Sequence, residues 1–329
     1  MSPSIPPTDP RPRPASPATE VWTMGELLAE VMRPERDLGL EAPATFLGPF
    51  PSGAPGIFID TVARLGHAAG IVSAVGDDPF GRAIVARLAR DGVRTDHVEV
   101  LATHPTGVAF VAYAGDGSRE FLFHWPHTAA VRAGAPDPAL AVGARAFHVM
   151  GCSLMADAGF RERLLATLDV FAAAGARISF DPNMRLELAG ADEARAVAER
   201  VLAATNVLLP GRDELLLLAG ETDVDAAAAA MLRRHPRLEV IAVKLGRHGA
   251  RVHTRDGAAD VPPYPVTEVD PTGAGDCFDA AFVCGLLDGL SPAEAAAQGN
   301  AAGALNAMAF GPMEGDISPA TVAALVGGR

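Results

Sequence analysis

The chain has 329 residues, 49% of them hydrophobic, and a formal net charge of −13. This length suits one α/β domain with an accessory element, or two domains. The negative charge argues against nucleic-acid binding, and no apolar run reaches the roughly 18 residues of a membrane span, so neither partner is expected. The Pro-rich N-terminus has no apolar signal segment, which favours a cytoplasmic protein.

Residues 1–18 contain seven prolines and are predicted to be a disordered tail before a single domain over 19–329. The segments that follow show the apolar periods of strands and helices. Glu30 is expected to be solvent-exposed. The predicted elements are strands at 21–24 and 27–32, a turn-rich link at 51–56, a helix at 57–65, a strand at 71–75, a helix at 82–90, and a hairpin of 106–114 and 119–125. Asp77 and Asp78 could hold a metal, but capping of the helix at 82–90 is favoured.

From residue 146 onward, apolar strand segments alternate with amphipathic helices. This alternation implies a parallel sheet covered on both faces, with ligands at the carboxyl ends of its strands. The predicted strands are 146–150, 178–180, 207–209 and 240–243, and the intervening helices end near 171, 204 and 219.

The run from Val269 to Ala280 carries the strongest chemical signal. Gly273, Ala274 and Gly275 precede Asp276 and an apolar periodic run at 278–290 that predicts a helix. A loop entering a helix there would direct backbone N–H groups and the positive end of the helix dipole at one point, which suits a phosphate. Because a phosphate repels a carboxylate, Asp276 is better suited to accept a proton from an attacking hydroxyl during phosphoryl transfer.

The string Asp270-Pro271-Thr272-Gly273-Ala274-Gly275-Asp276 closely resembles the D-T-x-G-A-G-D signature of ribokinase-like (PfkB) carbohydrate kinases, with Pro271 where the family usually has Thr. The resemblance implies a three-layer α/β/α fold with a mostly parallel central sheet and a small β-sheet lid, formed here by about 26–48 and 104–126. It also implies ATP- and Mg²⁺-dependent sugar phosphorylation, with 273–276 as the anion hole and Asp276 as the base. A potassium ion near Asp270 and a homodimer formed through the lid sheets are further expectations.

The resemblance assigns the sugar to the link at 51–56. Family members commonly show G-G-x-x-x-N there, whereas this chain has Ser52 for the first Gly and Ile57 where the Asn would fall. Gly53, Ala54 and Ile57 are therefore candidate sugar contacts, because glycine allows a ligand to approach the backbone closely. A plain strand-to-helix loop is the alternative.

Aromatic and histidine side chains at the end of the predicted hairpin could also line the sugar pocket. Trp125 offers a ring face, and His127, like His124, offers hydrogen bonds. Packing within the loop is the alternative interpretation.

The run Phe180-Asp181-Pro182-Asn183-Met184-Arg185 resembles the F-D-P-N-x-R of bacterial fructokinases and keto-deoxygluconate kinases. By this resemblance Asn183 faces the phosphates or the water shell of Mg²⁺, and Arg185 adds positive charge for phosphate or substrate; an Asx turn with a surface Arg is the alternative. Glu214 keeps the register of the family's N-x-x-E motif, which contacts Mg²⁺ through water, although Gly211 replaces the Asn.

The remaining candidates would contact the nucleotide. The run from Lys244 to Gly249 resembles the family's K-L-G-x-x-G, in which Gly246 and Gly249 pass close to ATP; Lys244 could meet a phosphate or lie at the surface. Thr272 belongs to the phosphate loop. Asn300 would contact the adenine from a helix of small residues at 298–304, for which tight packing is the alternative.

The resemblance favours a neutral ketohexose, tagatose or fructose, as the substrate. The strings at 48–60 and 127–129 look most like bacterial proteins labelled tagatose kinases, and Trp125 falls where keto-deoxygluconate kinases usually carry an Arg for the sugar acid. A 2-keto-3-deoxygluconate kinase is the first alternative. A non-catalytic sugar- or nucleotide-binding regulator on the same fold is the second.

Overall fold

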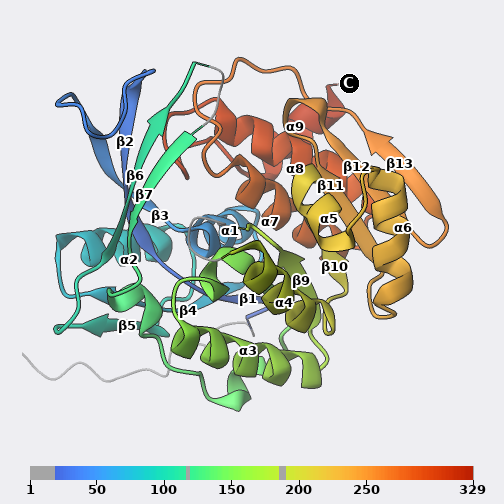
Figure 1. The fold of residues 1–329 in the computed structure, drawn as a ribbon, viewed down its shortest axis with the longest axis horizontal. Helices are drawn as coiled ribbons and strands as arrows, with labels where there is room; N and C mark the ends of the chain where they lie inside the picture. The colour runs from blue at the N-terminus through green and yellow to red at the C-terminus, as the bar shows by residue number, and fades with distance from the viewer. Residues whose placement is uncertain (1–18, 116–118, 185–189, 329) are drawn as a thin grey trace, which may run out of the picture.

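The computed structural model describes residues 19–115, 119–184 and 190–328, so the predicted tail lies outside the described residues. In this part of the chain the strands form one nine-stranded and one four-stranded sheet (Figure 1). The order in the larger sheet is β13 (Gly257–Val261), β12 (Ala250–Thr254), β11 (Val240–Lys244), β10 (Val207–Leu208), β9 (Arg177–Asp181), β8 (Ala146–Met150), β1 (Val21–Met24), β4 (Ala69–Gly76) and β5 (Val98–Leu101). Its pairings are parallel except those of β12, which runs antiparallel to β11 and β13. The predicted mostly parallel sheet is confirmed.

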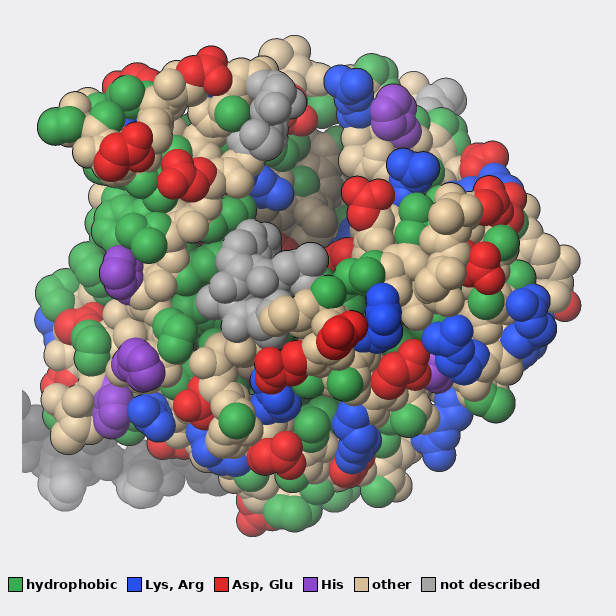
Figure 2. Space-filling model, viewed as in Figure 1, with side chains coloured by type: hydrophobic (Ala, Val, Ile, Leu, Met, Phe, Trp, Pro, Cys, Tyr) green, Lys and Arg blue, Asp and Glu red, His purple; other side chains and the backbone are tan. Residues whose placement is uncertain are grey.

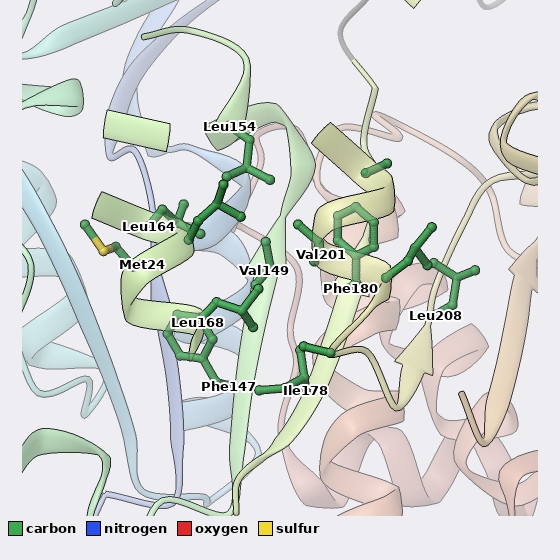
Figure 3. Close-up of a cluster of buried hydrophobic side chains, with 14 of the residues drawn as sticks. Met24, Phe147, Val149, Leu154, Leu164, Leu168, Ile178, Phe180, Val201 and Leu208 are labelled. Atoms are coloured by element: carbon green, nitrogen blue, oxygen red, sulfur yellow. The ribbon is translucent and has the colours of Figure 1, made fainter. Parts of the chain in front are cut away.

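Helices cover both faces of the large sheet because its strands are apolar on both sides. In β8, Phe147 and Val149 enter one hydrophobic cluster, while Ala146 and Met150 enter another. Figure 3 shows the first cluster, in which Phe147 and Val149 lie with Leu168. The first face is covered by α3 (Ala158–Ala173), α4 (Ala191–Leu202), α5 (Arg212–Ala219) and α6 (Val224–Arg234), and the second by α1 (Ala54–Arg64), α2 (Pro79–Arg90), α7 (Ala274–Leu287) and α8 (Pro292–Ala307). The terminal helix, α9 (Pro319–Gly327), packs beside α8.

The smaller sheet is a lid beside the main body, with a hollow between the two (Figure 2). Its order is β3 (Leu47–Ser52), β2 (Leu28–Arg36), β6 (Gly107–Tyr113) and β7 (Arg119–His124). The strands β6 and β7 are the predicted hairpin. Strand β3 was not predicted because Pro49 and Pro51 disfavour a sheet ladder; it lies at the lid's edge, where proline is tolerated.

Small residues allow α7 and α8 to pack closely. A Cβ atom on Gly299 would lie 2.7 Å from the Phe278 ring, and one on Gly303 would lie 2.8 Å from the carbonyl oxygen of Ala274. The tight packing considered for 298–304 is therefore observed. None of the helices in the described residues is both long and apolar enough to cross a lipid bilayer.

Candidate active site

The glycine-rich loop is shaped by α7, which starts directly after it. Gly273 precedes the helix with a φ of 79°, a left-handed conformation that glycine adopts without strain. A Cβ atom on Gly273 would lie 2.2 Å from the carbonyl oxygen of Pro312, so the site has no room for a side chain. Helical geometry gives the N–H of Gly275, in the first turn, no acceptor within the helix. The predicted loop-to-helix junction is confirmed, and it suits an anion.

A buried group of hydrogen bonds holds the start of this loop against the lid. The Tyr113 hydroxyl, at the end of β6, donates to Asp270 Oδ1 at 2.8 Å and lies 2.8 Å from Thr272 Oγ1. The N–H of Thr272 donates to Asp270 Oδ1, and the N–H of Gly311 donates to Asp270 Oδ2 at 2.9 Å. Burial and the nearby Asp270 raise the pKa of Tyr113, so its hydroxyl remains a donor. The lid is thus tied directly to the phosphate loop.

Two pockets meet at the loop. A pocket of about 300 Å³ lies under the lid, and one of about 390 Å³ lies between α7, α8 and the turn at 246–249. Among the described residues, those that line both pockets are Lys244, Pro271 and Gly275. Asp276 lines the lid-side pocket, and Ala274 lines the other. A group passing between the pockets would therefore pass beside Gly275 and Lys244.

The lid-side pocket brings together residues predicted from separate parts of the chain. Gly53, Ala54 and Ile57 contribute from the start of α1, and Asp276 from α7. Trp125 lines the pocket with 2% of its surface exposed. In the described part of the chain, its indole N–H meets no acceptor. Trp125 is therefore a nearly buried part of the pocket wall that also packs with Leu28, Ala109 and Ala130.

Two buried glutamates in this pocket were not predicted. Glu26 and Glu30 are 2% and 4% exposed, and they accept hydrogen bonds from the hydroxyls of Ser153 and Ser52, respectively. The expectation that Glu30 is solvated is wrong, because β2 is an inner strand of the lid, paired with β3 and β6 at this position. One sequence signal could have found Glu26: it follows β1, at the carboxyl end of a core strand, where ligands bind.

The second pocket contains some of the residues predicted to meet the nucleotide, whereas Asn183, Thr272 and Gly273 line the lid-side pocket. Gly246, Gly249 and Asn300 line it. Gly249 has a φ of 88°, and a Cβ atom there would lie 2.2 Å from the carbonyl oxygen of Val261. The Asn300 amide nitrogen donates to the carbonyl oxygens of Val261 and Pro262, both at 3.1 Å, which holds this side chain at the pocket wall.

Asn183 and Glu214 lie together on the wall of the lid-side pocket. The N–H of Asn183 donates to Asp181 Oδ1 at 3.1 Å, so the Asx turn considered for this segment is present. The Glu214 carboxylate accepts from the N–H groups of Met184 and Gly211, both at 2.7 Å. Burial, with a contribution from Asp181, raises the pKa of Glu214. Backbone donors thus fix the carboxylate on each of its oxygens.

The donor set around Glu214 fits a magnesium ion carried by a nucleotide. Among the described residues, no group of three or more His, Cys, Asp or Glu side chains could hold a metal ion directly. Mg²⁺ in phosphate-transfer sites keeps several waters and takes few protein ligands besides the substrate phosphates. A fixed carboxylate facing the pocket, as Glu214 is, suits a contact through such a water.

Lys244 is not a surface lysine. Its ammonium donates to Asp181 Oδ2 at 2.8 Å and to the two oxygens of Asp279 at 3.1 and 2.9 Å. The side chains of Asp181 and Asp279 are 4% and 0% exposed. Burial opposes the charge of Lys244, but the two carboxylates raise its pKa, so it stays protonated. Sequence reasoning missed Asp279, although it lies one helical turn after Asp276.

Three further residues that the sequence suggested as site candidates are not among the described residues that line either pocket. His127 is exposed and lines neither pocket, because the turn from Trp125 is closed by Thr128, whose N–H and hydroxyl both donate to the Trp125 carbonyl. Arg185 lies outside the described residues. Asp78 caps α2 by accepting from the N–H of Gly81 at 2.9 Å, as favoured over a metal role.

Comparisons with known proteins agree with this geometry. The model of the pfkB family of carbohydrate kinases matches residues 51–318. Fructokinase-1 of Oryza sativa subsp. japonica is 34% identical over 298 residues, which cover 87% of this chain and 91% of the rice protein. Fructokinase-1 of Zea mays is 33% identical over 267 residues, which cover 80% of this chain and 81% of the maize protein.

Solved structures share the fold. An E. coli protein assigned as ribokinase II, solved with ATP and Mg²⁺, has a TM-score of 0.88 at 36% identity and covers 94% of this chain and 100% of its own. The Xylella fastidiosa fructokinase with bound ATP has a TM-score of 0.82 at 26% identity, covering 94% and 99%. Since the family model spans most of the chain, this protein belongs to the pfkB family of carbohydrate kinases and is a sugar kinase with the ribokinase-like fold.

Proposed function

We propose that the protein transfers the γ-phosphoryl group of ATP to a primary hydroxyl of a neutral ketohexose, fructose or tagatose. The observation that carries the proposal is the meeting of two pockets at Gly275, with Asp276 on the wall of the lid-side pocket. The fructokinases among the relatives support fructose. The sequence resemblance at 48–60 keeps tagatose as the second ketohexose.

In the proposed reaction the sugar hydroxyl lies beside Asp276, which accepts its proton as the hydroxyl oxygen bonds to the γ-phosphorus. The bond from the γ-phosphorus to the β–γ bridging oxygen breaks, and ADP leaves with that electron pair. The N-terminal donors at 273–275, with Thr272, stabilise the charge on the phosphoryl oxygens. A bound Mg²⁺ would neutralise phosphate charge, and Glu214 and Asn183 would hold its waters.

The pocket's polar groups match a sugar rich in hydroxyls. The carboxylates of Glu26 and Glu30 line the pocket as hydrogen-bond acceptors, and Trp125 forms part of its wall. Sugar hydroxyls can serve as both donors and acceptors. One observation favours 2-keto-3-deoxygluconate as a second candidate: Arg119 of the lid lines the pocket, where it could pair with a sugar acid's carboxylate.

The sequence also suggested a potassium ion, a non-catalytic regulator and a homodimer. Three donors, from Tyr113, Thr272 and Gly311, point at the Asp270 carboxylate, and the potassium ion near Asp270 stays a prediction. A non-catalytic regulator is not carried further, because a binding protein needs no base at Asp276. The homodimer stays a prediction, supported by Leu122 of the lid, whose side chain is 45% exposed.

The test is an ATP-consumption assay with Mg²⁺ and the purified protein against fructose, tagatose, ribose and 2-keto-3-deoxygluconate. Turnover of one ketose, with nearly all activity lost in Asp276→Asn, is the expected result. The melting temperature of Asp276→Asn should match that of the wild type, which separates lost chemistry from lost folding. Near-normal turnover by Asp276→Asn would refute the assigned base, and turnover of the sugar acid alone would replace the substrate.

A further inference from the structure

The charged group around Lys244 is unusual for this chain, in which Lys244 is the only lysine. Its ammonium is held by carboxylates from two different elements: Asp181 at the end of β9, and Asp279 in α7. Both carboxylates are buried, and taking charges out of water costs several kcal/mol per ion. A structure-only role could be filled by apolar side chains at lower cost, so the position of the ammonium calls for a functional explanation.

That position is the boundary between the two pockets. Lys244 lines both of them, and a Cβ atom on Gly275 would lie 3.8 Å from its ammonium nitrogen. Gly275 belongs to the loop that presents helix N-terminal donors. The ammonium therefore lies where the γ-phosphoryl group would pass from nucleotide to sugar.

The pairing geometry controls where the charge lies. Asp279 meets the ammonium with both oxygens, at 2.9 and 3.1 Å, and Asp181 meets it with one, at 2.8 Å. A lysine side chain otherwise has a flexible four-carbon stem and a compact charge that can move. Because Asp279 is on the same helix as Asp276, one turn away, it also ties the charge to the helix that carries the base.

We propose that Asp279 is a positioning residue for phosphoryl transfer: together with Asp181 it holds the Lys244 ammonium against the phosphate loop, where this ammonium contacts the γ-phosphate of ATP. The inference rests on the proposed kinase function. Asp279 does not touch the substrate itself but acts through Lys244. Its loss should therefore resemble the loss of Lys244 and should add nothing when Lys244 is already absent.

The first test measures binding rather than turnover. Calorimetry with Mg²⁺ compares the affinities of ADP and of AMPPNP, a non-hydrolysable ATP analogue, in the wild type, Asp279→Asn, Lys244→Met and the double variant. Each variant should lower the preference for AMPPNP over ADP by roughly tenfold, the typical effect of one charge-assisted hydrogen bond to phosphate. ADP affinity, which does not involve the γ-phosphate, should stay within about twofold of the wild type and confirms that the pocket is folded.

The double variant keeps the test decisive. It removes the ammonium together with one of its two buried carboxylates, so it leaves one carboxylate, Asp181, without the ammonium, where Lys244→Met leaves two. Its preference for AMPPNP should equal that of Lys244→Met. An unchanged preference in Asp279→Asn, or effects of the two substitutions that add, would overturn the proposal.

Kinetics supply a second readout. In Asp279→Asn, kcat should fall roughly tenfold to a hundredfold while the KM for the sugar changes less than about twofold, because the sugar pocket is left intact. A rise in the sugar KM with normal kcat would contradict a positioning role. If the wild type phosphorylates no sugar, the proposed function fails on its own, and the nucleotide preference still decides the role of Asp279.

Discussion

Asp60 offers a sharp test of how charge is buried behind the lid-side pocket. It lies in α1, whose first turn supplies Ala54 and Ile57 to that pocket, and it is fully buried. Its nearest cations, Arg64 and Arg87, lie 3.7 and 3.8 Å away. Among the described residues, no donor reaches either carboxylate oxygen. Burial raises the pKa of Asp60 to about 7, although the charge of Arg87 opposes this shift.

The sign of the effect follows from proton binding. Between an unfolded pKa of 3.8 and a folded pKa of about 7, the folded state binds more protons, so the free energy of unfolding falls as pH rises through this window. Above this window, the ionised Asp60 lowers the free energy of unfolding by about 4 kcal/mol, because the two pKa values differ by about three units and each unit is worth 1.36 kcal/mol. Asp60→Asn removes the ionisation, so the variant lacks this pH dependence.

Urea unfolding at several pH values measures the prediction. The stability of Asp60→Asn relative to the wild type should rise by about 2.5 kcal/mol between about pH 5 and pH 8. Any effect of the introduced amide on stability that does not depend on pH cancels when the two pH values are compared. Asp77→Asn is the matched control, because the Asp77 side chain is 58% exposed in a surface pair with Arg82. A relative stability of Asp60→Asn that does not change with pH would refute the reasoning.

Three substitutions test the site itself. Gly273→Ala should lower the free energy of unfolding by about 2 kcal/mol or more and abolish turnover, since its Cβ would overlap the Pro312 carbonyl oxygen at 2.2 Å; urea unfolding and the kinase assay check this, and a normal variant would contradict the close approach. Tyr113→Phe loses the hydrogen bond to Asp270, so kcat should fall while ADP affinity is kept; an unchanged kcat would show that the lid contact is dispensable. Trp125→Phe keeps an aromatic ring but fills less of the pocket wall, which should raise the sugar KM with the KM for ATP unchanged; an equal rise in both would point to general damage.

Local patterns were sufficient for much of the fold. The hairpin of β6 and β7 and the helix after Gly275 were predicted because alternation and helical periodicity are recorded in neighbouring residues. Helix α1 begins three residues earlier than predicted, at Ala54, because Pro55 is compatible with a first helical turn. Strand β3 and helix α6 were not predicted: β3 carries prolines tolerated only at a sheet edge, and the alanines of α6 give little periodic contrast.

The candidate site, too, was predictable from the sequence only in part. The junction of loop and helix at Gly273 and Asp276 was predicted from the sequence because it depends only on neighbouring residues, small residues followed by a helical apolar period. The burial of Glu30, by contrast, depends on strand pairing with β3 and β6, and a single strand does not record its partners. The ion pairs of the Lys244 ammonium likewise depend on Asp181 and Asp279, which lie 63 and 35 residues away along the chain.

By itself the sequence determined the glycine-rich loop that enters a helix, the alternation of strands and helices, and the family resemblance, since each is written in residues close together along the chain. Tertiary structure alone decided that Lys244 is paired with Asp181 and Asp279, that Tyr113 ties the lid to Asp270, and that His127 lies outside the pocket. The physical reason is that burial and hydrogen-bond partners are set by which distant segments pack together. The strength of an ionic or polar contact depends on that packing, because the cost of removing a group from water is met only by the partners placed around it.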